Sequence, residues 1–172
     1  TVMESDMNQE NTNKRLQAIE QYNAGTQILQ SLVQGQTASF MDDWESCIEH
    51  LEKAIELDFT FADAHHNLAH ACLALLEHSP QRIAWRVGRD PEDRDYDGET
   101  FNKKAYGAVN IALNLKPEFP EAYNTLGKVL VGLGRHKEAI QAFDIAIQQS
   151  PDYGTALENR EKTLSMIHDE AS

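Results

Sequence analysis

Four histidines lie close together in the sequence, at His65, His66, His70 and His78. His66 and His70 are four positions apart, so on a helix both would face one ligand. A zinc-protease site requires the motif H-E-x-x-H, but Asn67 occupies its second position and the general base is missing. A simple metal site is one interpretation of this pair. The other is that these residues have no metal role and that His65 lies in the core.

An acidic stretch resembles the start of a calcium-binding loop, with Asp93, Asp95 and Asp97 at alternate positions before Gly98. An EF-hand loop also needs a bidentate glutamate at its twelfth position, which is Lys104 here. The sequence therefore favours an acidic surface loop, balanced by its own arginines, over a calcium site.

The other reactive side chains fit structural roles. The many carboxylates of residues 42–58 recur along one exposed face of an expected helix, which is typical of a solvated surface. Cys47 and Cys72 occupy apolar positions, so we expect buried small hydrophobes rather than a disulfide or a reactive thiol. The sequence has no G-x-S-x-G motif, phosphate-binding loop or dinucleotide fingerprint. We therefore predict neither catalysis nor a cofactor, and no metal site.

Composition narrows the classes of partner. The 172 residues are 41% hydrophobic and 25% charged, and 15 basic against 28 acidic residues give a net charge of −13. This charge disfavours nucleic acid and favours a basic or apolar protein partner. No apolar run approaches the roughly 20 residues of a membrane span, and no signal peptide opens the chain. We expect a cytoplasmic location by default, and a disordered tail over residues 1–12.

The chain contains an internal repeat. Four positions recur at an offset of 34: Ala105, Val109, Ala112 and Pro117 match Ala139, Phe143, Ala146 and Pro151. A further set, Cys47, Leu51, Ala54 and Ile55, lies 58 positions before its counterparts, which is one period plus 24 inserted residues. Both halves of each unit show the 3.6-residue period of amphipathic helices.

The last complete unit carries the most specific pattern. It reads Tyr123-x2-Leu126-Gly127-x2-Leu130, then Ala139-x3-Phe143-x2-Ala146, then Pro151. This pattern resembles the tetratricopeptide repeat (TPR) signature. The second unit follows it apart from the insertion and His65 at the usual aromatic position. The first helix of the first unit fits two registers, with Gly25 or Gly35 as the small residue, and we favour Gly25 with a long helix.

The resemblance implies an all-α fold, a right-handed superhelical solenoid of three helix-turn-helix units. These units cover about 13–59, 62–117 and 120–153, within a domain of residues 13–172. The 24-residue insertion lies within 77–100, and a capping helix over 152–168 closes the array. Within the insertion, Arg82, Trp85 and Arg86 form a short amphipathic stretch.

The resemblance also implies a concave groove, lined by the first helix of each unit, that binds a peptide or helix. Asn124 in this groove could bond a peptide backbone through both its amide N–H donor and its carbonyl oxygen. The expected lining residues are Tyr22, Thr26, Leu29, Asp63, His66, His70, Leu73, Glu121, Asn124, Lys128 and Val131.

One TPR subclass clamps the acidic C-terminal carboxylate of chaperones with Lys and Asn in unit one, Asn in unit two, and Lys plus Arg in unit three. Only Asn67 agrees with that set. Tyr22 and Thr26 replace the first pair, and Glu121 and Thr125 replace the last. We therefore expect that an acidic chaperone tail is not the partner.

The leading functional hypothesis is a non-catalytic interaction module, an adaptor or assembly factor that binds a segment of another protein. One alternative is a metal- or calcium-responsive binder acting through His66 and His70 or through residues 93–97. Another is self-association, with Trp85 inserted into a neighbour's groove.

Overall fold

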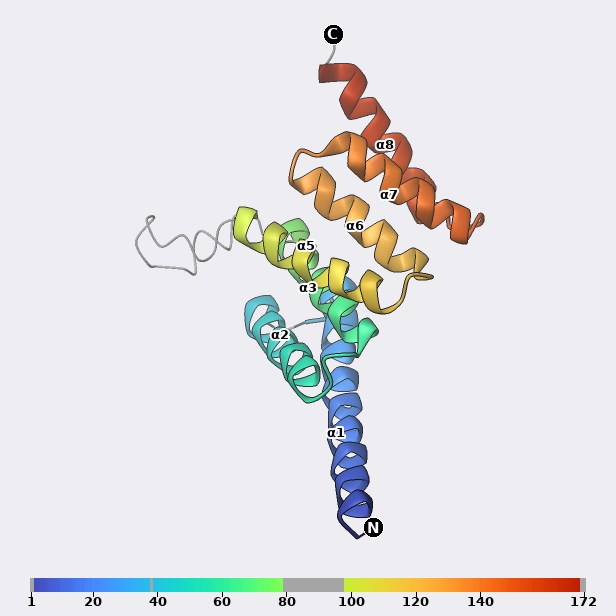
Figure 1. The fold of residues 1–172 in the computed structure, drawn as a ribbon. Coiled ribbons are helices and arrows are strands. Elements are labelled where there is room, and N and C mark those ends of the chain that lie inside the picture. Colours follow the sequence, from blue (N-terminus) through green and yellow to red (C-terminus); the bar gives the residue numbers. More distant parts are fainter. Residues whose placement is uncertain (1, 38, 79–97, 171–172) are drawn as a thin grey trace.

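The computed structural model describes residues 2–37, 39–78 and 98–170 (Figure 1). Its described part is an all-α helical repeat solenoid with no strand in those ranges. The helices are α1 (Val2–Val33), α2 (Phe40–Leu57), α3 (Ala62–His78), α5 (Gly98–Leu115), α6 (Pro120–Gly132), α7 (His136–Gln149) and α8 (Gly154–Glu170).

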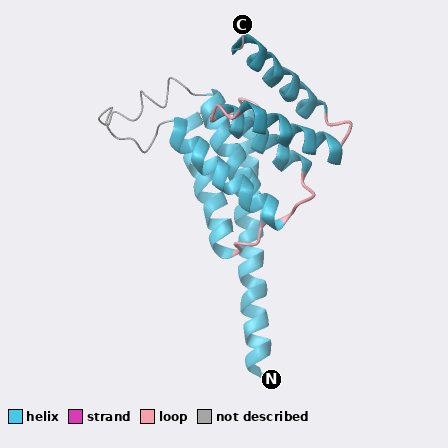
Figure 2. Ribbon diagram, turned by 45° about the horizontal axis from the view of Figure 1, so that its top comes forward, coloured by secondary structure: helices cyan, strands magenta, loops and turns pink. Residues whose placement is uncertain are grey.

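The helices pack as successive pairs. α1 packs against α2, α3 against α5, and α6 against α7, while α8 covers the end of the array against α6 and α7. Figure 1 shows these pairs following one another along the array, and Figure 2 shows the N-terminal part of α1 extending beyond the other helices. The first helix of each pair, together with α8, therefore forms one face, and the second helices form the other.

The N-terminal segment differs from expectation. Residues 1–12 were predicted to be a disordered tail, whereas α1 begins at Val2 and runs through this segment. Residues 7–17 are exposed, so tertiary burial does not hold them. The physical reason is local: no Gly or Pro interrupts the segment, extension of an existing helix costs little, and Lys14 pairs with Glu10 at 2.8 Å.

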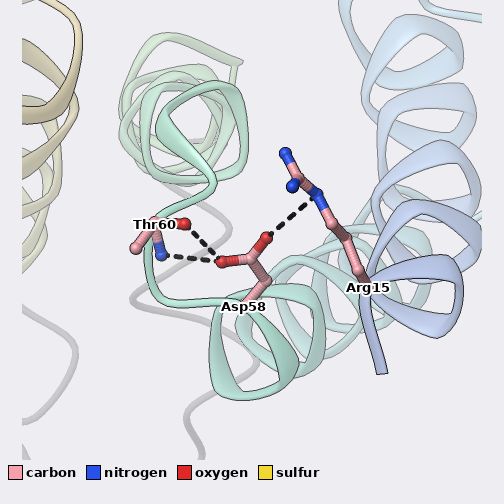
Figure 3. Close-up of polar contacts among 3 residues, drawn as sticks. All are labelled: Arg15, Asp58 and Thr60. Carbon is pink, nitrogen blue, oxygen red and sulfur yellow. Dashed lines mark hydrogen bonds and ion pairs between the residues drawn. The ribbon is translucent and has the colours of Figure 1, made fainter. Parts of the chain in front are cut away.

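The turn after α2 ties α1 to the next unit (Figure 3). One carboxylate oxygen of Asp58 accepts hydrogen bonds from the backbone N–H of Thr60 at 3.0 Å and from its hydroxyl at 2.6 Å. The other oxygen lies 3.8 Å from Nε of Arg15 on α1. The α2–α3 connection is thereby closed locally and linked to α1.

Two glycines mark close helix contacts. A β-carbon at Gly25 would lie 2.9 Å from Cγ of Leu51, which agrees with the preferred register of α1. A β-carbon at Gly127 would lie 2.3 Å from the ring of Phe143, so α6 and α7 approach closely only because this position has no side chain. Gly35 instead lies beyond the end of α1, at φ +67° with open space around it.

The core contains the residues whose burial was predicted. Cys47 and Cys72 are free and fully buried, and burial raises the pKa of each thiol to about 12. His65 is also buried, its Nε2 lies 2.9 Å from the carbonyl oxygen of Phe59, and its ring meets the Phe59 ring edge-on. The prediction of structural roles for these three side chains is confirmed.

The insertion predicted within 77–100 is described only at its ends. α3 continues to His78 and α5 begins at Gly98, so residues 98–100 belong to a helix. Arg82, Trp85, Arg86 and the acidic stretch 93–97 lie outside the described residues, and their expected roles stay predictions. None of the described helices combines the length and apolar character needed to cross a bilayer.

Candidate functional site

A hollow of about 300 Å³ opens on the face made by the first helices, between α3, α6 and α8. Its apolar walls include Leu73 and Leu76 on α3, Val131 on α6 and Met166 on α8. We call it the α3–α6–α8 hollow. The remaining residues around it are Glu77, Asn102, Lys128, Gly132, Phe143, Asn159, Lys162 and Thr163.

Charge at this hollow is divided. Lys128 and Glu77 form an ion pair at 2.7 Å on its wall, with their side chains 26% and 47% exposed. Lys162 on α8 lies on the same lining, where it is exposed. An apolar lining with two ammonium groups and one carboxylate beside it suits a peptide that buries an apolar side chain and offers polar groups next to it.

Side-chain hydrogen bonds join neighbouring first helices. Nδ2 of Asn67 on α3 donates to Oγ1 of Thr26 on α1 at 2.9 Å. Nε2 of His66 lies 3.1 Å from Oγ1 of Thr125 on α6. Three of the expected groove or clamp positions, Thr26, Asn67 and Thr125, are thus engaged in hydrogen bonds within the chain.

The same arrangement continues to the capping helix. Nδ2 of Asn159 on α8 donates to Oδ1 of Asn124 on α6 at 2.9 Å, and Asn124 is only 5% exposed. Asn124 was expected to bond a peptide backbone. Its carbonyl instead accepts from within the chain, so in this structure it positions α8 against α6.

The histidine pair lies between α3 and α6. The rings of His66 and His70 are stacked with centroids 6.3 Å apart, and the other neighbour of His66 is the Phe119 ring, at 4.7 Å. Burial, and then the neighbouring His70, lower the pKa of His66 to about 4. Burial, and then Lys128, also lower the pKa of His70. Both rings are therefore neutral near pH 7.

Among the described residues, no third metal ligand accompanies the His66–His70 pair. Within residues 2–37, 39–78 and 98–170, no group of three or more His, Cys, Asp and Glu is placed to hold a metal ion. The His66 nitrogen nearest α6 already faces the Thr125 hydroxyl.

The predicted groove residues separate into two groups. Leu73, Lys128 and Val131 come together at the α3–α6–α8 hollow. The others lie outside it. Tyr22 packs on Phe61 with ring centroids 4.6 Å apart, Leu29 is buried, Asp63 faces Lys116 at 3.4 Å, and Glu121 is exposed, while Thr26, His66, His70 and Asn124 make the contacts given above.

The contribution of α8 to this site was not predicted from the sequence. This helix was expected to be a polar cap, yet Asn159, Thr163 and Met166 line the hollow. Their spacing of i, i+4 and i+7 places them on one helix face. Asn124, Lys128 and Val131 on α6 have the same spacing, and this shared spacing was the signal available in the sequence.

Comparisons with known proteins agree with this fold. Residues 120–153 match the family model described as tetratricopeptide repeat. No curated protein matches the sequence. Among solved structures, the second TPR domain of human RPAP3, in complex with the HSP70 peptide SGPTIEEVD, is 19% identical with a TM-score of 0.62, covering 87% of this chain and 97% of that one.

Two further structures are similar. The TPR domain of Arabidopsis OM64 is 18% identical with a TM-score of 0.61, covering 87% of this chain and 96% of that one. The TPR2B domain of yeast Sti1, in its pHsp70 complex, is 14% identical with a TM-score of 0.62, covering 88% of this chain and 98% of that one.

Because two of these three structures carry chaperone peptides, the comparisons give no support to our expectation that an acidic tail is excluded. The matched repeat at residues 120–153, the 34-residue period and the shared fold together show that this chain contains a tetratricopeptide repeat and has a TPR-like fold.

Proposed function

We propose that this chain is a non-catalytic interaction module, an adaptor or assembly factor, that binds a peptide or helix of a partner protein in the α3–α6–α8 hollow. The observation that supports this most directly is the composition of the hollow. Three of the groove residues expected from the TPR resemblance, Leu73, Lys128 and Val131, line it together. A preformed site of this kind lowers the ordering cost of binding.

The contacts favour an apolar anchor on the partner. Leu73, Leu76, Val131 and Met166 offer an apolar lining of a size suited to one large side chain. The pair Lys128–Glu77 at the rim can meet backbone or polar groups of either sign.

We also propose that the partner is not an acidic chaperone tail. At the positions that other TPR domains use to clamp a carboxylate, Thr26 accepts from Asn67 and Thr125 faces His66. These internal contacts support a partner other than an acidic chaperone tail. Lys128 and Lys162 would be the cations available to such a tail if it bound.

Peptide selection followed by matched variants tests the proposal. Peptides selected from a random library against the whole chain would be titrated by calorimetry into wild type, Leu76→Glu and Leu115→Glu. Leu76 lines the hollow, whereas Leu115 is 39% exposed on α5 and makes no part of it. We expect Leu76→Glu to weaken binding about tenfold or more, because an apolar contact is replaced by a buried charge, and Leu115→Glu to leave it unchanged.

Equal binding by both variants would contradict the assignment to this hollow. A peptide SGPTIEEVD, the sequence carried by the RPAP3 complex, serves as a separate arm. Low-micromolar binding of this peptide that is lost in Lys128→Ala would overturn the exclusion of acidic tails while retaining the hollow as the site.

A further inference from the structure

A second hollow, of about 1030 Å³, lies on the opposite face between the second helices α2 and α5. We call it the α2–α5 groove. Trp44 and Ile48 of α2 and Phe101 of α5 lie along it, and all three are largely buried. The Trp44 and Phe101 rings meet edge-on with centroids 5.3 Å apart, and Nε1 of Trp44 donates to the carbonyl oxygen of Ala71 at 2.8 Å. The floor is therefore apolar and fixed.

The wall of this groove on α2 is acidic. Glu45, Glu49, Glu52 and Glu56 recur at i, i+4, i+7 and i+11, so they form one stripe on one face of the helix. All four are exposed. They directly flank the stripe of Trp44 and Ile48.

The lysines of the groove compensate half of this charge. Lys104 of α5 contacts Glu52 across the groove at 2.5 Å, and Lys53 contacts Glu56 at 2.7 Å. Glu45 and Glu49 have no ion-pair partner among the described residues. Two carboxylates spaced one helical turn apart are thus left beside an apolar floor, within a chain of net charge −13.

We infer that the α2–α5 groove binds a basic amphipathic helix of a partner protein. Two arginines or lysines of that helix, four positions apart, pair with Glu45 and Glu49, and an apolar side chain between them rests on Ile48 and the Trp44–Phe101 edge. Charge complementarity selects this occupant, because a neutral helix would leave the carboxylates unpaired and an acidic one would be repelled. The groove is separate from the α3–α6–α8 hollow, so this inference does not depend on the proposed function.

The test uses the whole chain and a defined probe. The probe is a fluorescein-labelled, alanine-based helix with the 18-residue length of α2, with arginines at i, i+4, i+7 and i+11 and leucines beside them. Its anisotropy would be measured with wild type, with Glu45→Gln/Glu49→Gln, and with Glu158→Gln/Glu161→Gln. The last pair removes the same charge from the exposed face of α8, outside the groove.

We expect micromolar binding that weakens with salt, and an affinity loss of about tenfold in Glu45→Gln/Glu49→Gln. The α8 variant should change affinity by less than about twofold, because screening confines charge effects to short range. A probe with its leucines replaced by alanine should bind several-fold more weakly.

Three results would overturn the inference. No binding of the probe at low salt would show that the groove is not a binding site for a basic helix. An equal loss of affinity in both charge variants would show that the net charge of the chain, not the groove, attracts the probe. A several-fold gain in affinity in Trp85→Ala, which leaves the net charge unchanged, would show that the chain's own segment competes for the groove, and a partner helix would then not be its natural occupant.

Discussion

The close approach of α6 and α7 gives a prediction whose sign follows from the structure. A β-carbon at Gly127 would lie 2.3, 2.6 and 2.6 Å from three ring atoms of Phe143. Phe143 is fully buried, so the ring cannot move into solvent, and the neighbouring α3–α6–α8 hollow is the space into which it could shift. Replacing Gly127 with alanine therefore forces α6 away from α7 or displaces the ring.

Two opposing effects set the magnitude of Gly127→Ala. Alanine favours a helix over glycine by about 1 kcal/mol, whereas overpacking of a filled core costs about 1–3 kcal/mol. Because the clash involves a rigid, buried ring, we use the upper end of that range. The net loss in free energy of unfolding is then about 2 kcal/mol, and the melting temperature should fall by about 4–8 °C.

Gly107→Ala is the matched control. Gly107 lies within α5, is exposed, and has no neighbouring atom within 4 Å of the place that a β-carbon would occupy. At Gly107 only helix propensity changes, so the same substitution should raise the free energy of unfolding by up to about 1 kcal/mol. Urea unfolding followed by far-UV circular dichroism would measure both variants.

A double-mutant cycle isolates the contact. In Gly127→Ala/Phe143→Leu the smaller side chain relieves the clash. The double variant should therefore lose less free energy of unfolding than the two single variants lose together, by about 1 kcal/mol or more. If Gly127→Ala were as stable as wild type, or if the cycle showed no coupling, the reasoning from close packing would be refuted.

Three further outcomes are expected. Because the folded pKa of His66 is about 4 and its ordinary value is 6.5, the unfolded chain binds more protons between these values, and stability should fall as pH drops from 6.5 toward 4. Measured by urea unfolding, the free energy of unfolding should fall between pH 7 and pH 5 by about 1–2 kcal/mol more in wild type than in His66→Gln; an equal fall in both proteins would contradict this. Asn124→Ala and Asn159→Ala should each cost about 1 kcal/mol but combine to less than their sum, and strict additivity would argue against the α6–α8 bond. Cys47 and Cys72, whose pKa values are raised to about 12, should react with a thiol reagent only on unfolding, and rapid native labelling would show that they are accessible.

The repeat made most of the fold predictable from sequence. Helix ends followed local signals: α6 ends at Gly132, close to the glycine at position 134 with φ +71°, and α7 ends at Gln149 before Pro151. The extension of α1 was not predicted, because its residues lack the apolar period used to recognise helices. Such a segment is helical through continuity with α1 rather than through burial.

The site was predictable only in part. Periodicity identifies which residues share a helix face. The TPR resemblance named Leu73, Lys128 and Val131 as groove residues, and the structure brings these three together at the α3–α6–α8 hollow; that they bind a partner stays a prediction. Periodicity cannot show which polar side chains on that face meet across neighbouring helices. The Asn124–Asn159 contact depends on how closely α8 packs on α6. The spacing of the repeats along the sequence does not determine that distance.

These internal contacts explain where the face made by the first helices stays open. The contact Asn67–Thr26 between α3 and α1 and the contact His66–Thr125 between α3 and α6 use polar groups that a peptide would otherwise need. Toward the ends of α3 and α6, the lining becomes apolar at Leu76 and the hollow opens. A ligand that competed with these partly buried contacts would have to replace their hydrogen bonds at no net gain, whereas one that fills the hollow covers apolar surface at little polar cost. The partner segment should therefore engage the α3–α6–α8 hollow first, and its specificity should depend more on its apolar anchor than on a clamped carboxylate.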